Sequence, residues 1–313
     1  MTDLRRRFIL FSMLVISVIM VLASLLLLLH AHSDASGAAL HRWLVTAAVF
    51  IAMVFAGSWL ISRRAVAPIE KAWQKQLDFT ADASHELRTP LAAIRANLEI
   101  LLDCREESVE SQRKWLENID AESRRMTKLV DDLLTLARAD THKQELACED
   151  FSLRQAASEA VAAFEAAASQ QGMSLALQMQ ENIMLQGDRG RLKQLLMILL
   201  DNAIRYSGGK GIVVAADCRK GSVALKVRDD GCGIGQEHLG RLFERFYRVA
   251  ELRGKNPDGS GLGLAIARWI AEGHGGSISV HSTLGKGTEF VVRLPVRNAR
   301  QKNKKVLAQN LNP

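Results

Sequence analysis

The sequence predicts a multidomain protein with two transmembrane helices, a helical hairpin and a C-terminal α/β domain. Two uncharged apolar runs, residues 8–29 and 43–61, lie near the N-terminus. Apolar residues then recur in steps of three and four between residues 87 and 101 and between residues 115 and 136, which is the period of an amphipathic helix. From Phe151 onward helical and strand-like patterns alternate, which indicates a mixed α/β unit. The patterns predict helices at residues 153–170, 189–206 and 262–272 and strands at residues 212–216, 223–228, 278–281 and 289–294.

The two apolar runs predict membrane spans. The first covers a hydrocarbon core of about 30 Å at about 1.5 Å per residue. A cleaved signal peptide is the alternative, but its apolar region is usually only about 7–15 residues long. Arginines 5–7 precede the first run, and Arg63 and Arg64 follow the second. Because cytoplasmic flanks carry the excess of basic residues, we expect a multi-pass protein of the inner (cytoplasmic) membrane with cytoplasmic C-terminal domains.

The net charge of +7 comes from the two ends of the chain, so the middle is nearly neutral. A nucleic-acid-binding domain needs a basic face and is not predicted. The four cysteines show no metal-binding spacing and are expected to be reduced thiols. The expected boundaries are an N-terminus with the first span at 1–30, an external loop at 31–42, the second span at 43–62, a juxtamembrane helical linker at 63–78, the hairpin at 79–140, a polar linker at 141–150, the α/β domain at 151–296 and a disordered basic tail at 297–313.

The external loop is too short for a folded ligand-binding domain. A signal would therefore enter through the spans, through a membrane partner or through the loop itself. The loop region holds His30, His32 and His41, which are side chains that bind transition metals and titrate near neutral pH. Metal binding or pH sensing there, and a polar turn with neither role, both stay open.

His85 lies in the first periodic segment but off its apolar stripe. A neutral imidazole there can attack an electrophile near pH 7. Thr89 lies one turn further along on the same face, Glu86 is adjacent, and Pro90 removes a backbone hydrogen bond from this turn. A single histidine in such a position is usually only an exposed residue, so its role depends on the rest of the chain. The stripe consists of Leu87, Leu91, Ile94, Leu98 and Leu101.

A polar break at residues 106–111 separates the two periodic segments, which predicts two antiparallel helices. With one apolar stripe each, such helices bury little surface alone. Pairing two hairpins in a four-helix bundle covers both stripes. A hairpin packed on its own domain predicts the same pattern, so periodicity does not separate a dimer from a monomer.

Two motifs suited to a nucleotide open the α/β region. An apolar helical run ends at Asn202, whose side-chain oxygen suits a cation. Arg205 shares that helix face and suits a phosphate, and Tyr206 suits a base. Asp229 follows a strand-like run, where a carboxylate can accept from an exocyclic amine, and the two glycines after it allow close approach of the backbone.

Two further motifs follow. Residues 242–248 form an aromatic amphipathic segment. Gly259, Gly261 and Gly263 then precede a helix, whose N-terminal N–H groups suit phosphate oxygens. Each motif alone is weak, but their order after His85 makes a chance arrangement very improbable.

Together these motifs resemble those of the sensor histidine kinases of two-component systems. Residues 79–91 resemble the phospho-acceptor box, the later motifs resemble the N, G1, F and G2 boxes, and Gly287-Thr288 resembles the last glycine box. The resemblance covers residues 74–295. It implies a helical-hairpin dimerisation domain that forms a four-helix bundle in a homodimer. It also implies an α/β sandwich ATP-binding domain of the Bergerat type, with a mobile lid between residues 236 and 260.

The resemblance also implies roles for individual residues. His85 takes the phosphoryl group, Glu86 orients or accepts the imidazole proton, and Thr89 orients a water molecule for dephosphorylation. Asn202 binds Mg²⁺, but the family usually has a second Asn four residues earlier, where this chain has Ile198, which cannot ligate a cation. The implied nucleotide contacts are Asn202, Arg205, Tyr206, Asp229, Gly231, Gly233, Ile234, Phe243, Gly259, Gly261, Leu262, Gly263 and Thr288.

The predicted activity is phosphorylation of His85 from ATP with Mg²⁺, transfer to an aspartate on a response-regulator receiver domain, and the reverse phosphatase reaction. The expected partners are a second copy of the chain, the membrane, the regulator and a membrane protein that supplies the signal. Two alternatives stay open. An ATP-hydrolysing relative of the same fold needs a general base where Ile198 stands, and Ile198 is also the only mark of a degenerate, non-catalytic sensor partner.

Overall fold

The computed structural model describes residues 67–103, 108–140, 146–179, 183–209, 211–219, 221–250 and 259–296, together with scattered positions between residues 18 and 59. The predicted membrane spans lie largely outside the described residues, and the histidines of the external loop and the basic tail lie wholly outside them. Among the described residues, no helix combines the length and the apolar composition needed to cross a bilayer.

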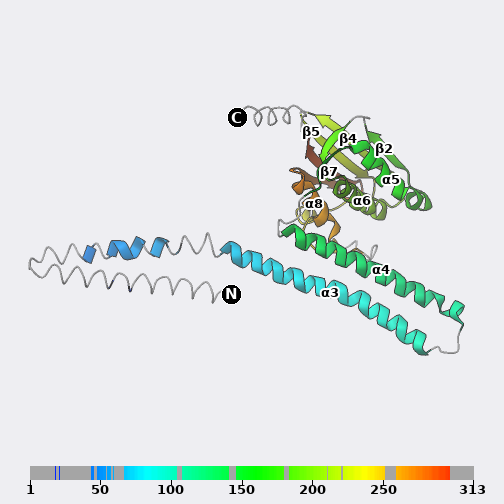
Figure 1. The fold of residues 1–313 in the computed structure, drawn as a ribbon, viewed down its shortest axis with the longest axis horizontal. Coiled ribbons are helices and arrows are strands. Elements are labelled where there is room, and N and C mark those ends of the chain that lie inside the picture. Colours follow the sequence, from blue (N-terminus) through cyan, green and yellow to red (C-terminus); the bar gives the residue numbers. More distant parts are fainter. Residues whose placement is uncertain are drawn as a thin grey trace, which may run out of the picture. The chain divides into compact units, whose positions relative to one another are not determined.

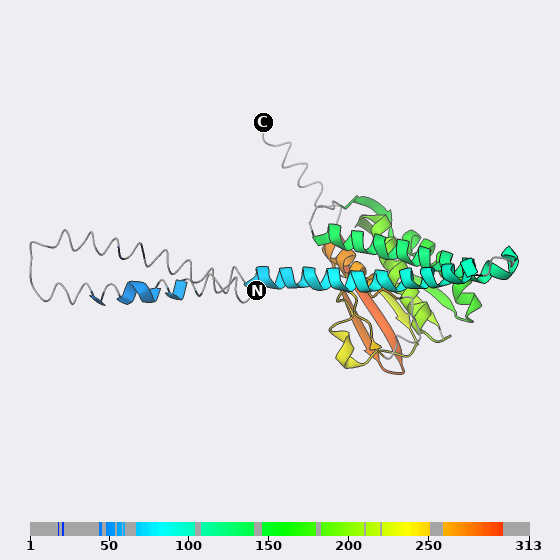
Figure 2. The same cartoon turned by 90° about the horizontal axis from the view of Figure 1, so that it is seen from below.

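The predicted hairpin consists of α3, Ala67–Asp103, and α4, Val109–Asp140. The two helices lie side by side in both views (Figure 1 and Figure 2). The sequence predicted the polar break between residues 106 and 111, but α4 already begins at Val109. The reason is a cap: the Ser108 hydroxyl oxygen accepts a hydrogen bond from the Ser111 N–H at 3.3 Å, which satisfies one donor of the first turn.

The apolar stripes of the hairpin are only partly covered within one chain. Leu91 and Leu98 of α3 remain 50% and 43% exposed. Leu129 and Leu136 of α4 are buried, in the same apolar cluster as core residues of the α/β domain. Part of the surface that the sequence analysis assigned to a dimer is therefore used by contact with the chain's own α/β domain.

A second part of the chain forms an α/β sandwich (Figure 1). Its five-stranded sheet has the order β2-β4-β5-β7-β6, in which β2 and β4 are parallel and the other neighbours are antiparallel. A separate two-stranded sheet pairs β1 with β3. The elements are β1 Glu149–Ser152, α5 Leu153–Gln170, β2 Leu175–Met179, β3 Met184–Gly187, α6 Arg189–Tyr206, β4 Ile212–Arg219, β5 Ser222–Asp229, α7 Gln236–Leu239, α8 Gly263–Gly273, β6 Ser277–Thr283 and β7 Gly287–Pro295.

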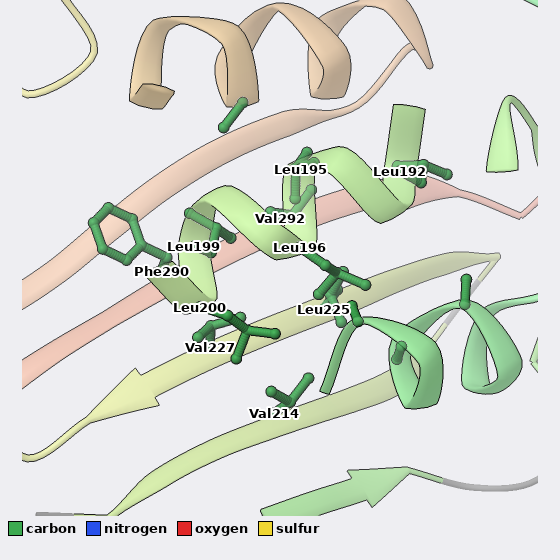
Figure 3. Close-up of a cluster of buried hydrophobic side chains, with 14 of the residues drawn as sticks. Leu192, Leu195, Leu196, Leu199, Leu200, Val214, Leu225, Val227, Phe290 and Val292 are labelled. Atoms are coloured by element: carbon green, nitrogen blue, oxygen red, sulfur yellow. The ribbon is translucent and has the colours of Figure 1, made fainter. Parts of the chain in front are cut away.

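Helix α6 forms the centre of the core, because its apolar residues recur along one face. Its inward leucines meet alternate residues of β4, β5 and β7 that point up from the sheet (Figure 3). Full burial of such a side chain contributes roughly 1.5–3 kcal/mol to folding. The fully buried leucines, each at most 1% exposed, are Leu192, Leu195, Leu196, Leu199 and Leu200.

Local caps place the two central helices where the sequence predicted them. The Ser152 side chain accepts from the Gln155 N–H, and Asp188 accepts from the Arg191 N–H at 2.9 Å. Helices therefore begin at Leu153 and Arg189. Strands β1, β2 and β3 were not predicted, and β1 begins at Glu149, inside the segment predicted as a polar linker.

An imidazole joins the two helices that flank the sheet centre. His274, just after α8, has its Nε2 2.9 Å from the Asp188 N–H and its Nδ1 2.7 Å from the Ile270 carbonyl oxygen. Nε2 therefore accepts and Nδ1 donates, which fixes one neutral tautomer. A Cβ on Gly187 would lie only 2.5 Å from the His274 ring, so glycine leaves the space that the ring occupies.

Candidate active site

A cavity of about 680 Å³ opens where α6 ends, β5 ends and α8 begins, and α4 of the hairpin contributes to its wall. It brings together most of the nucleotide-binding residues that the sequence predicted, from segments far apart in the chain. The predicted residues that line it are Glu86, Asn202, Arg205, Tyr206, Asp229, Gly233, Ile234, Gly259, Gly261, Gly263 and Thr288. His85, Thr89, Gly231, Phe243 and Leu262 are not among the lining residues.

Asp229 supplies a buried carboxylate at the end of β5, where only 5% of the residue is exposed. One of its oxygens accepts the Gly231 N–H at 2.9 Å. Burial raises the pKa of the Asp229 carboxyl, while hydrogen bonds from the backbones of Gly231 and Thr288 lower that pKa. A carboxylate has room for further donors beyond these two, so an amino group entering the cavity finds an oriented acceptor.

Gly231 serves the fold of this loop and does not touch the cavity. A Cβ at this position would lie 2.2 Å from the carbonyl oxygen of Tyr206. The Cys232 N–H donates to that same carbonyl at 3.3 Å. The loop after β5 is thus pressed onto the end of α6, which places Asp229 beside the helix that carries Asn202.

Two other predicted contacts also act behind the cavity wall. Leu262 is fully buried at the start of α8. Phe243 packs edge to face on Phe290, with the ring centroids 6.5 Å apart. Both side chains support the residues that line the cavity.

The aromatic segment, residues 242–248, contacts the segment that carries Gly259, Gly261 and Gly263. Phe246 has a φ of 61°, which is unusual for a residue other than glycine. Its N–H donates to the Gly261 carbonyl at 3.0 Å, and a Cβ on Gly261 would lie 2.7 Å from the Phe246 carbonyl carbon. The next residue, Tyr247, lines the cavity and places its hydroxyl 2.8 Å from Nδ1 of His238. The sequence indicated an aromatic patch here but not that Tyr247 faces the site.

Arg205 is held by an acidic residue one turn earlier on α6. Its Nε donates to the Asp201 carboxylate at 2.8 Å. The other oxygen of Asp201 lies 3.9 Å from Nζ of Lys128 on α4. Asp201 thus links the predicted phosphate contact to the hairpin, a connection that sequence spacing alone does not reveal.

The hairpin wall of the cavity was not predicted. Asp132 in this wall is notable because burial raises the pKa of its carboxyl to about 6, against a lowering effect of Lys128 and a further raising effect of Asp131. The lining residues of α4 are Ala121, Glu122, Arg124, Arg125, Lys128, Leu129 and Asp132. They recur at helical spacing, so they form one face, but this face looks like a solvated charged surface in the sequence.

His85 is exposed on α3, as a phosphoryl acceptor requires. The Thr89 hydroxyl donates to the His85 carbonyl oxygen at 3.4 Å, which keeps Thr89 on the same side of the helix. Glu86 is partly buried and lines the cavity, one residue from the imidazole.

The residues near Asn202 fit a magnesium ion only with help from the nucleotide. Asn202 faces the cavity, whereas Ile198 offers a methyl group that lies 3.2 Å from the place of a Cβ on Gly263. Within the described part of the chain, no cluster of three or more His, Cys, Asp or Glu side chains is placed to hold a metal ion. Asn202 would therefore bind Mg²⁺ together with phosphate oxygens and water.

Comparison with known families agrees with this geometry. The model of the "His Kinase A (phospho-acceptor) domain" matches residues 75–142, and that of the "Histidine kinase-, DNA gyrase B-, and HSP90-like ATPase" matches residues 187–298. Together they cover more than half of the chain. A phospho-acceptor hairpin followed by such an ATPase domain defines a histidine kinase.

Individual relatives agree with that class. The chain is 38% identical to sensor histidine kinase YkoH of Bacillus subtilis over 74% of this chain and 50% of YkoH. Histidine kinase AdeS of Acinetobacter baumannii has a similar structure, with a TM-score of 0.56 and 27% identity over 68% of this chain and 98% of that one. Full-length ShkA in complex with AMPPNP has a TM-score of 0.55 and 27% identity over 70% of this chain and 46% of that one.

The chain therefore belongs to the sensor histidine kinases of two-component systems. It spans about half the length of the curated relatives it matches. The α/β sandwich is accordingly an ATP-binding domain of the histidine kinase type.

Proposed function

We propose that the protein is a membrane-bound, homodimeric kinase that phosphorylates its own His85 from ATP and passes the phosphoryl group to an aspartate of a response regulator. The observation that carries this proposal is the composition of one cavity. Its wall combines Asp229, Asn202 and the glycines before α8 with Glu86, the neighbour of the acceptor histidine.

The chemistry assigns a task to each group. The lone pair of an imidazole nitrogen of His85 forms a bond to the γ-phosphorus while the bond from that phosphorus to the oxygen of ADP breaks. The proton on the other ring nitrogen passes to the Glu86 carboxylate, which leaves a neutral phosphohistidine. Asp229 orients the adenine, and the backbone around Gly261 and Gly263 receives the phosphates. Mg²⁺, when bound at Asn202, neutralises phosphate charge.

Several features support the remaining parts of the proposal. The exposed Leu91 and Leu98 on α3 offer an apolar face for a second hairpin, in keeping with the phospho-acceptor family. The apolar runs at 8–29 and 43–61 support anchorage in the cytoplasmic membrane, and a neighbouring membrane protein is the proposed source of the signal. Thr89, one turn after His85, supports a phosphatase role toward the phosphorylated regulator.

The direct test is incubation of the full chain with γ-labelled ATP and Mg²⁺. We expect a phosphate on the protein that is labile in acid and stable in base, the behaviour of a phosphohistidine. His85→Ala should abolish the label, whereas Thr89→Ala should retain it and slow dephosphorylation of the regulator. Label that persists in His85→Ala refutes the acceptor assignment. ATP hydrolysis without label on the protein would instead indicate an ATP-hydrolysing relative of the same fold. No consumption of ATP would indicate a degenerate, non-catalytic sensor partner.

A further inference from the structure

We propose that Tyr247 packs its aromatic ring against the nucleoside half of bound ATP, and that His238 is a positioning residue that holds this ring in place. The inference rests on the proposed nucleotide site, to which it adds one binding residue and one supporting residue. The sequence patterns singled out neither: Tyr247 is one of several aromatic residues in the segment 242–248, and His238 belongs to none of the motifs.

The hydroxyl group of Tyr247 is held by an imidazole from α7. Nδ1 of His238 lies 2.8 Å from the Tyr247 hydroxyl oxygen. Nε2 of the same imidazole lies 3.7 Å from the Glu237 carboxylate. This carboxylate favours a proton on Nε2, which leaves Nδ1 to accept the hydrogen bond from the tyrosine hydroxyl. Only 20% of the His238 side chain is exposed, so the imidazole has little freedom to turn away.

Two further contacts fix the ring of Tyr247. The guanidinium carbon of Arg241 lies 4.4 Å from the centroid of the tyrosine ring, which is a cation–π contact on one face. Arg241 is held in turn by the Glu244 carboxylate at 3.1 Å. On the backbone side, Phe246 has a φ of 61° and donates its N–H to the Gly261 carbonyl oxygen. The backbone, the hydroxyl and one ring face are therefore fixed, and the half-buried tyrosine lines the cavity.

A series of hydrogen bonds joins α7 to the base end of the cavity. The Thr288 backbone donates to Asp229, the proposed adenine contact. The Thr288 hydroxyl lies 3.0 Å from the hydroxyl of Ser282, which accepts the Ile234 N–H at 2.8 Å. Ile234 lines the cavity two residues before α7 begins. These bonds place α7, and the tyrosine ring that His238 holds, on the side of the base. A neutral ring also suits the uncharged base and ribose better than the triphosphate.

A ring that is already held in position strengthens binding, because a side chain that becomes immobilised only when the ligand enters lowers the affinity. Contact between a base and an aromatic ring is substantial, so Tyr247→Leu should weaken ATP binding roughly 5- to 150-fold. Tyr247→Phe and His238→Ala each remove only the hydrogen bond that positions the ring. Each should weaken ATP binding roughly 2- to 10-fold.

Calorimetric titration of the full-length chain in detergent tests the inference. All variants carry His85→Ala, so that no phosphoryl group is transferred during the titration. They are Tyr247→Leu, Tyr247→Phe, His238→Ala, the double change Tyr247→Phe with His238→Ala, and His238→Asn, whose side chain keeps an acceptor near the place of Nδ1. His281→Ala is the matched control, because His281 is an exposed histidine of β6 that does not line the cavity. ADP is titrated beside ATP, since the two nucleotides share the nucleoside.

We expect Tyr247→Phe and His238→Ala to weaken ATP and ADP by the same factor, and the double change to weaken them no more than either single change. His238→Asn and His281→Ala should bind both nucleotides like the parent chain. With His85 restored, the changes at Tyr247 and His238 should raise the KM for ATP in the labelling reaction and leave the maximal rate unchanged. Thermal melting identifies any variant that fails to fold, and Tyr247→Phe, the smallest change, then decides the test.

The contrary outcomes are separable. Additive losses in the double change, or no restoration of binding by His238→Asn, would show that His238 does not act through the tyrosine hydroxyl. Wild-type affinity in Tyr247→Leu, or a loss for ATP without a loss for ADP, would overturn the contact with the nucleoside. A parent chain that binds neither nucleotide would overturn the proposed nucleotide site itself, and this inference with it.

Discussion

Replacing Asp229 with asparagine tests the adenine end of the site. The wild-type carboxylate is buried and accepts the Gly231 N–H at 2.9 Å. An asparagine of nearly the same shape keeps one oxygen for that bond. Its NH₂ group, however, points a donor at a position where the wild type offers an acceptor to an amino group. The substitution therefore removes recognition of the base while leaving the volume of the cavity unchanged.

The size of the effect follows from the charge on the lost acceptor. A hydrogen bond to a charged group contributes about 1.5–3 kcal/mol, so ATP should bind roughly 10- to 150-fold more weakly. Burial raises the pKa of Asp229, which means that folding pays for desolvating the charge, and the neutral amide avoids that cost. The melting temperature without nucleotide should therefore shift by no more than about 2–4 °C, the equivalent of 1 kcal/mol.

The assay is displacement of a fluorescent ATP analogue by ATP, with thermal melting as the check on folding. Asp230→Asn is the matched control, because Asp230 is exposed and its carboxylate pairs with Arg228 at 3.2 Å instead of facing the cavity. The control should bind ATP like the wild type. If Asp229→Asn also binds ATP with wild-type affinity, Asp229 does not hold the adenine and the orientation of the nucleotide proposed here is wrong.

Three further predictions concern the walls of the cavity and the loop that supports them. Because the folded-state pKa of Asp132 is raised from 3.8 to about 6, folding is favoured at low pH and loses stability as pH rises through that window; Asp132→Asn should match the wild type near pH 4 and melt higher at pH 7. Gly231→Ala should cost about 1–3 kcal/mol in a denaturant titration, because its Cβ would lie 2.2 Å from the Tyr206 carbonyl oxygen; unchanged stability would contradict that contact. Ile198→Asn should lower the Mg²⁺ concentration needed for labelling, and an unaltered Mg²⁺ titration would show that the site does not use this position.

Local signals were sufficient for the elements that hold the nucleotide site. Helices α5 and α6 were predicted with their observed bounds, because each begins at a side-chain cap and carries a regular apolar face. Strands β4 to β7 were predicted two or three residues too short at some of their ends. Buried and outward-facing residues alternate along these strands, and this alternation predicted where the strands lie. Backbone pairing with the neighbouring strand continues beyond the alternating part into polar residues such as Arg219, which the sequence pattern does not mark as strand.

The missed strands depend on contacts that local patterns do not contain. Strand β2 pairs in parallel with β4, across the whole of α6, and β1 pairs with β3 across α5. Each has only four or five residues, so neither periodicity nor turn residues set them apart from loop. Tertiary pairing alone defines them.

The nucleotide site, like the fold, was predicted where residues carry a local sequence motif and missed where their position depends on tertiary contacts. The motifs placed Asn202, Asp229 and Thr288 around one ligand, and all three line the cavity. The contribution of α4 was missed, because its charged residues look like a solvated face until Leu129 is seen buried beside them. Backbone features such as the positive φ of Phe246 were equally invisible, since they depend on the partner loop at Gly261.

The contact of the His274 ring with Gly187 and Asp188 restricts which substitutions are tolerated where α6 begins and α8 ends. Gly187 has no side chain where the His274 ring sits, and that ring in turn satisfies the Asp188 N–H. A bulkier residue at one position is tolerable only with a smaller ring at the other, so the two are expected to co-vary over evolutionary time. Because α6 carries Asn202 and α8 begins at Gly263, divergence at this distant pair is constrained by the spacing between the two halves of the nucleotide pocket.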